Sequence, residues 1–168
     1  MTVLVAAASK HGATQEIAGR IGATLAEHGV GVEVRELGDV DDLRGYDAFV
    51  VGSGIYLGNW LKEARRFVDA HAAELAQHPT WLFASGSIVG DPPRGDDPNA
   101  LRAGLAEKLM AKTGAHEHKL FAGRVDMSRL GMLEKAAVRG AHATEGDHRD
   151  WRQIDDWAAG VARCLEER

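Results

Sequence analysis

The residues best suited to bind an anion lie near the start of the chain, between an apolar run and an amphipathic stretch. The apolar run over 3–8 gives way to Ser9-Lys10-His11-Gly12-Ala13-Thr14, and apolar residues then recur at helical spacing. The first N–H groups of a helix have no intrahelical acceptor, and the helix dipole adds positive potential there. The pattern therefore predicts a phosphate site on residues 9–14, with an ordinary turn capped by Ser or Thr as the alternative.

Different residues of this loop contribute different groups for binding a phosphate. Ser9 and Thr14 can donate hydroxyl hydrogen bonds, and Gly12 permits close approach of the backbone. Lys10 and His11 add positive charge that such a site does not require.

Two further loops place small polar residues beside apolar ones at the ends of expected strands. Ligands of open parallel sheets bind outside the carboxyl ends of the strands, so the loops are expected to lie together. A flat heteroaromatic ring with a polar tail suits this edge, although Tyr56 and Trp60 could instead seal the core. Together with Ser9, Lys10, His11, Gly12, Ala13 and Thr14, the candidate binding residues are Ser53, Gly54, Ile55, Tyr56, Leu57, Gly58, Asn59, Trp60, Ser85, Gly86, Ser87, Ile88, Val89 and Gly90.

Short apolar runs alternate with amphipathic stretches along the chain, which predicts an α/β fold with a parallel sheet covered by helices on both faces. In the closing helix, Trp157 is expected to anchor the core. The expected strands are 2–8, 31–36, 47–53, 80–85 and 118–123, and the expected helices are 14–28, 60–77, 99–113 and 151–166, with a short one inside 130–142.

Length and composition favour one domain over residues 1–168 and limit the classes of partner. With 20 basic and 25 acidic residues the net charge is −5, which disfavours nucleic acid. The single cysteine, Cys164, excludes an internal disulfide and is expected to be partly buried and inert. A basic leader with an apolar run is absent, as is an apolar stretch of about 18 residues, so we expect a cytoplasmic protein.

The sequence lacks the motifs that several other classes of enzyme or binding site require. The glycines at 52, 54 and 58 miss the dinucleotide spacing by one position, and neither a G-x-x-x-x-G-K-[ST] loop nor a G-x-S-x-G elbow occurs. His116 and His118 lack a third ligand at useful spacing, so they are expected to be solvated and no metal site is expected.

Several segments carry a resemblance to the flavodoxin-like superfamily, and more narrowly to its branch of menaquinone-dependent protoporphyrinogen dehydrogenases. The resemblance covers nearly the whole chain and implies a five-stranded sheet in the order 2-1-3-4-5. It also implies FMN as the cofactor, with its phosphate on residues 9–14 and its ring between the loops at 53–60 and 85–90. The resembling segments are Val5-Ala6-Ala7-Ala8-Ser9-Lys10-His11-Gly12-Ala13-Thr14 with Glu16-Ile17-Ala18, the stretch from Gly52 to Trp60, Phe121-Ala122-Gly123-Arg124-Val125, and Gly146-Asp147-His148-Arg149-Asp150-Trp151.

The function that this resemblance implies is transfer of electrons or hydride from a reduced organic donor to an acceptor such as a quinone. Its specific form is dehydrogenation of protoporphyrinogen, and it assigns no catalytic side chain because the flavin performs the redox step. The alternatives are a flavodoxin-type electron shuttle, or a binding or regulatory module that keeps the fold without flavin.

The segment from Arg124 to Arg139 interleaves apolar and basic residues, including Leu133 and Lys135. Our hypothesis is that it borders the flavin entrance and meets a redox partner or the inner face of a membrane. The alternative is a surface helix packed on the edge of the sheet. Oligomeric state does not follow from these patterns.

Overall fold

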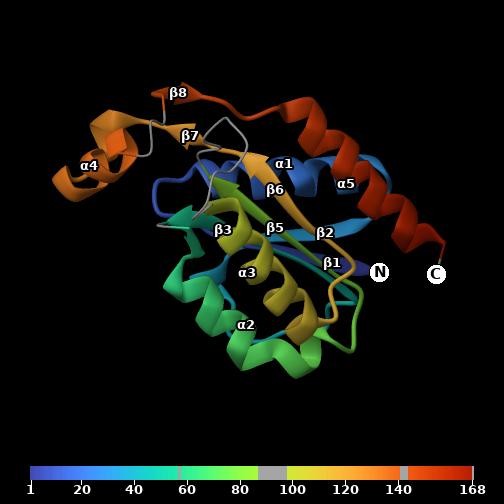
Figure 1. The fold of residues 1–168 in the computed structure, drawn as a ribbon. Coiled ribbons are helices and arrows are strands. Elements are labelled where there is room, and N and C mark those ends of the chain that lie inside the picture. Colours follow the sequence, from blue (N-terminus) through green and yellow to red (C-terminus); the bar gives the residue numbers. More distant parts are fainter. Residues whose placement is uncertain (57, 87–97, 141–143, 168) are drawn as a thin grey trace.

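The central sheet is parallel, and its strand order places the loops of interest at one edge. The computed structural model describes residues 1–56, 58–86, 98–140 and 144–167, with only the backbone for 98–103 and Ala137. In this part of the chain the order is β2-β1-β3-β5-β6, as the family resemblance implies for five strands numbered in chain order (Figure 1). The parallel strands are β1 (Thr2–Ala8), β2 (Gly31–Glu36), β3 (Ala48–Tyr56), β5 (Thr80–Gly86) and β6 (His118–Ala122).

Helices cover both faces of this sheet, which explains the nearly continuous apolar runs of its inner strands. Alternate residues of β1 point to opposite faces: Val5 packs with α1 (Ala13–Glu27) and α5 (Trp151–Glu166). Leu4 packs in the cluster of the other face, which is covered by α2 (Lys62–Leu75) and α3 (Pro98–Thr113) (Figure 1). The α/β fold class is thus confirmed.

Aromatic packing and a close backbone approach fix the centre of the sheet. Trp157 is 8% exposed and meets the edges of Phe83 and Phe121, and its indole N–H donates to Glu117 at 2.8 Å, so its predicted core role is confirmed. Gly52 lies against the Phe83 ring, where an added Cβ would come within 2.1 Å of Cζ. A side chain at this position would therefore displace the ring.

A hairpin replaces the predicted start of the second helix. Strand β3 continues to Tyr56 and pairs antiparallel with β4 (Asn59–Trp60), with Ile55 opposite Trp60. Gly58 has a φ of 75° in the turn, a conformation that glycine adopts without strain. The apolar residues before Lys62 match both a strand and a helix, and pairing with β3 decides for the strand.

The chain leaves the sheet between β6 and α5 and forms an excursion that the sequence predicts only in part. Its two ends pair as β7 (Arg124–Val125) and β8 (Gly146–Asp147), while α4 (Met132–Gly140) lies between them and stands away from the sheet (Figure 1). Met132 and Leu133 are 89% and 86% exposed. Cys164 is also exposed, so the expectation of a partly buried thiol was wrong.

The short helical turns and the remaining expected elements fall close to their predicted positions. Helices α1, α3 and α5 begin within one residue of their expected starts, and α4 lies inside 130–142. The 3₁₀ turns are η1 (Leu37–Asp39) and η2 (Met127–Arg129).

Candidate functional site

The predicted phosphate loop forms a turn directly before α1. Gly12 is the residue before the first helical turn, and its φ of 85° is a left-handed conformation that disfavours most side chains. The N–H of Thr14 donates to Oγ of Ser9 at 3.2 Å, which closes the loop on itself. The carbonyl of Gly12 accepts from Glu16 N–H at 3.0 Å, which is the first intrahelical bond of α1, so the N–H groups of Ala13 and Gln15 have no intrahelical acceptor.

The hydroxyl of Thr14 connects this loop to the neighbouring strands. Its Oγ1 shares a buried hydrogen bond of 2.8 Å with Oγ of Ser85 at the end of β5. An added Cβ on Gly54 would lie 3.2 Å from the same oxygen. The start of α1 therefore meets the ends of β3 and β5, and this Thr14 hydroxyl is engaged within the protein.

Ser53 and Tyr56, two candidate residues of the second loop, have different surroundings. Ser53 is fully buried; its hydroxyl donates to the carbonyl of Gly54 at 2.8 Å and accepts from Leu61 N–H at 3.0 Å, which joins the hairpin to α2. Tyr56 is 37% exposed, and Nζ of Lys10 lies 4.3 Å from its ring centroid. Tyr56 is thus an accessible aromatic surface beside the phosphate loop.

Trp60 is almost completely buried, at 1% exposure, and its ring lies 5.7 Å from that of His118. This placement favours the core alternative for Trp60. Asn59 is exposed, and Ile55 and Gly86 are packed together at the ends of β3 and β5, where an added Cβ on Gly86 would lie 2.9 Å from Ile55 Cβ. Leu57, Ser87, Ile88, Val89 and Gly90 lie outside the described residues.

The donor set of the loop at 9–14 fits a phosphate. The loop offers first-turn N–H groups, the Ser9 hydroxyl and a glycine whose added Cβ would meet nothing within 4 Å. This open space in front of Gly12 leaves room for an anion to approach the backbone. The residues present are therefore compatible with the phosphate of FMN, and the exposed ring of Tyr56 lies beside the loop.

Glu134 on α4 reaches this loop, a contact that the sequence did not reveal because the partners are more than 120 positions apart. Its Oε1 lies 2.5 Å from Nζ of Lys10 and 3.3 Å from Nε2 of His11. Its Oε2 accepts from Gly131 N–H at 2.8 Å. The Lys10 ammonium, helped by Gly131 N–H, lowers the pKa of Glu134 from 4.5 to about 2, so the carboxylate is charged at neutral pH.

A second ion-pair cluster holds the other end of the excursion against α1. Arg149 donates to Glu16 at 2.6 Å, to the carbonyl of Ala13 at 3.3 Å and to both carboxylate oxygens of Asp147. Its side chain is 3% exposed, so these partners replace water around the guanidinium. Arg149 lowers the pKa of Asp147 to about 2. Both clusters fix the excursion beside the candidate phosphate site.

The histidines considered for a metal have other surroundings. His118 packs against Trp60, and burial lowers its pKa, so the expectation that it is solvated was wrong. His116 is exposed, as predicted, and its ring centroid lies 5.0 Å from that of Trp81. Among the described side chains, no group of three or more His, Cys, Asp or Glu could hold a metal ion.

We expect Glu134→Gln to loosen α4 from the phosphate loop. Exposed ion pairs contribute about 0.2–1 kcal/mol, so hydrogen-exchange protection of the hydrogen-bonded amides 135–140 should fall about twofold to fivefold at pH 7. A lowered pKa means that the contact is complete above pH 4.5 and is lost as the pH falls towards 2. Wild-type protection, corrected for intrinsic exchange, should therefore be constant from about pH 5 to pH 8.

The matched control is Glu107→Gln, since none of the ion pairs between described residues involves Glu107. It should leave the protection of α4 unchanged. Equal protection in Glu134→Gln and wild type at pH 7 would show that other contacts hold α4.

No helix in the described ranges is long and apolar enough to cross a membrane.

Comparison with known proteins places this site in a family. The flavodoxin domain family matches the chain over residues 4–151. Protoporphyrinogen IX dehydrogenase [quinone] of Escherichia coli K12 is 21% identical, with 99% of this chain and 98% of that protein covered. Among solved structures, a flavodoxin from the domain Archaea is 18% identical with a TM-score of 0.65, and flavodoxin 2 from Bacillus cereus is 20% identical with a TM-score of 0.64; each comparison covers 99% of both chains. The chain therefore belongs to the flavodoxin domain family, for which FMN is the cofactor.

Proposed function

We propose that this protein is an FMN-dependent oxidoreductase that moves electrons or hydride from a reduced organic donor to an acceptor, with residues 1–168 acting as one domain. The observation that carries the proposal is the loop at 9–14, which presents first-turn N–H groups and an open Gly12 beside the exposed ring of Tyr56. FMN supplies the ability to accept and pass on electrons. The protein's own groups bind and orient it.

We assign the binding of the phosphate, the covering of the ring and the spacing of the loops to different residues. Glu134 already counters Lys10 and His11, so we expect the phosphate to depend on main-chain N–H groups and the Ser9 hydroxyl. Tyr56 would cover one face of the ring and exclude water from it. The buried bond between Thr14 and Ser85 would hold the loops at a fixed separation.

The finer form of the proposal is oxidation of a protoporphyrinogen with a quinone as acceptor. This form is supported by the protoporphyrinogen IX dehydrogenase of Escherichia coli, which aligns over 99% of this chain, although only 21% of the residues are identical. The excursion between β6 and α5 adds a structural reason, because it lies beside the phosphate loop where a bulky donor or acceptor would approach. A flavodoxin-type shuttle remains the second candidate, favoured by the flavodoxins among the similar structures.

Gly12→Asp should abolish tight FMN binding. The variant places a carboxylate next to the phosphate dianion, and even a partly screened repulsion of this kind raises the Kd at least about tenfold. Gly12→Asn is the matched control: it has the same shape, tolerates the left-handed backbone and stays neutral, so its Kd should remain within about threefold of wild type. Quenching of flavin fluorescence measures both.

Riboflavin separates the charge effect from a damaged loop. It lacks the phosphate, so both Gly12 variants should bind it equally. Wild-type protein that stays colourless and does not bind added FMN would favour the module without flavin and contradict the proposal.

Anaerobic reoxidation distinguishes a dehydrogenase from a shuttle. We expect the reduced holoprotein to regain its visible absorbance rapidly with menadione, a soluble quinone, and to be reduced by protoporphyrinogen. Stopped-flow absorbance follows both half-reactions. Rapid exchange with a ferredoxin-type protein, together with no response to quinone or porphyrinogen, would identify a shuttle instead.

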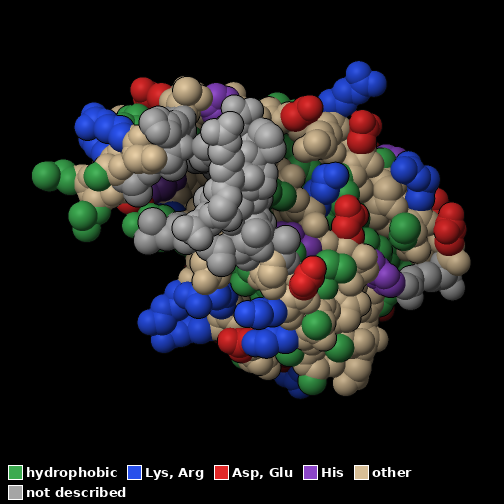
Figure 2. Space-filling view, in the orientation of Figure 1, with side chains coloured by type: hydrophobic (Ala, Val, Ile, Leu, Met, Phe, Trp, Pro, Cys, Tyr) green, Lys and Arg blue, Asp and Glu red, His purple; other side chains and the backbone are tan. Residues whose placement is uncertain are grey.

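We also propose that α4 brings the protein to an anionic membrane surface. Met132 and Leu133 are exposed at its start, where Figure 2 shows hydrophobic side chains projecting at the left, and Lys135 and Arg139 lie on the same helix.

Flotation with vesicles containing anionic lipid should carry a fraction of the protein, and neutral vesicles should carry less. Replacing Met132 and Leu133 by Gln should remove this association, whereas Val34→Thr, at an exposed apolar residue elsewhere, should not. Absence of wild-type protein from both floated fractions would eliminate the membrane role.

A further inference from the structure

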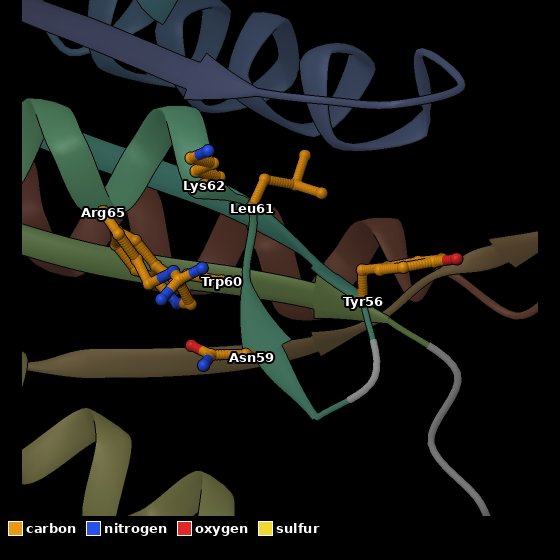
Figure 3. Close-up of a pocket in the computed structure, with 6 residues that line it drawn as sticks. All are labelled: Tyr56, Asn59, Trp60, Leu61, Lys62 and Arg65. Atoms are coloured by element: carbon orange, nitrogen blue, oxygen red, sulfur yellow. The ribbon is translucent and has the colours of Figure 1, made fainter.

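A cavity of about 330 Å³ opens at the start of α2, next to the β3–β4 hairpin. Figure 3 shows Arg65 extending from α2 towards the hairpin, while Tyr56 projects on the other side of it. The residues that line this pocket are Tyr56, Asn59, Trp60, Leu61, Lys62 and Arg65.

The walls of the pocket favour an anion. Of the described residues that line it, Lys62 and Arg65 are charged and none is a carboxylate. None of the ion pairs between described residues uses either of them, in contrast to Lys10, Arg124 and Arg149. Figure 2 shows basic side chains gathered over α2, which carries Lys62, Arg65 and Arg66.

Two uncharged parts of the pocket wall supply further hydrogen-bond donors. Helix α2 begins beside the pocket without a side-chain cap, so its first N–H groups add positive potential. The buried Nε1 of Trp60, which can only donate, has no hydrogen-bond partner within the described part of the chain. The pocket is therefore rich in donors and poor in acceptors.

Its position connects the pocket to the candidate flavin site. Tyr56 lines the pocket, and its ring also lies 4.3 Å from Nζ of Lys10 on the phosphate loop. A molecule held in the pocket by one end would thus place its other end near the ring that Tyr56 covers.

We propose that this pocket binds a carboxylate arm of the organic substrate, whose apolar body then lies against Tyr56. This inference rests on the proposed function and adds to it the residues that hold a carboxylate side chain of the substrate. The Arg65 guanidinium can hold a carboxylate through two parallel hydrogen bonds, and Lys62 adds a point charge. A cavity of about 330 Å³ admits one propionate-sized arm and leaves a tetrapyrrole body outside it.

The test compares a dicarboxylic acid with its ester. Mesoporphyrin IX is an air-stable tetrapyrrole with two propionate groups, and its dimethyl ester has the same body without the charges. In dilute non-ionic detergent, porphyrin fluorescence should report tighter binding of the acid by about tenfold or more. The double variant Lys62→Gln and Arg65→Gln should lose this preference and bind the two compounds alike.

Arg66→Gln is the matched control, because Arg66 is an exposed neighbour on the same helix that does not line the pocket. It should keep the preference within about twofold, as expected for a screened surface charge. An equal loss in Arg66→Gln and in the double variant would overturn the proposal, since a general positive field would then explain the binding. Retention of the preference in the double variant would also overturn it.

Further measurements separate this inference from the proposed function and from a protein partner. Titration with FMN in the absence of porphyrin tests the cofactor alone, and the acid-over-ester preference can be measured in FMN-free protein even if that titration fails. The double variant should still bind FMN as wild type does. If the preference is absent while electron exchange with an acidic ferredoxin falls in both the double variant and Arg66→Gln, the basic residues serve a protein surface and the carboxylate pocket is wrong.

Discussion

The candidate site depends on the parallel direction of β1, β3 and β5, whose apolar side chains are buried on both faces. Parallel pairing requires crossover connections whose helices cover both faces, and the shared direction brings the carboxyl ends of all three strands to one edge. The hydrogen bond between Thr14 and Ser85 then joins the first turn of α1 to the end of β5 at 2.8 Å. Because this bond is buried, its loss would leave two polar groups without water, and the loops are correspondingly fixed.

The basic side chains around this edge fall into two groups, according to whether a carboxylate pairs with them. Lys10, Arg124 and Arg149 are paired with Glu134, Glu16 and Asp147, so they hold the excursion between β6 and α5 against α1. Lys62 and Arg65 have no such partners among the described residues, and they line a cavity. A paired cation stabilises the arrangement of the protein, whereas an unpaired cation in a pocket is available to a ligand. The first group therefore holds the structure together, and the second group is the one to which we assign recognition.

Much of the fold could be predicted because hydrophobic periodicity reports burial directly. The continuous apolar run of β1 and the helical period after Thr14 place the first βα unit within one residue of its observed bounds. Periodicity was ambiguous at Trp60, which matches both a strand and a helix, and only its pairing opposite Ile55 resolved this. The short strands β7 and β8 were not predicted, since two-residue strands leave no periodic signal.

The sequence by itself determined the α/β architecture, the position of the loop at 9–14 and the family resemblance, because local residue order encodes them. Tertiary structure decided which candidate side chains face inward: Ser53 and Thr14 are engaged in internal hydrogen bonds, and Trp60 is buried, while Tyr56 stays accessible. It also decided the contact of Glu134 with Lys10 and the pocket formed by Lys62 and Arg65. Such contacts depend on distances in space between residues far apart in the chain or on different elements, and local pattern carries no information about those distances.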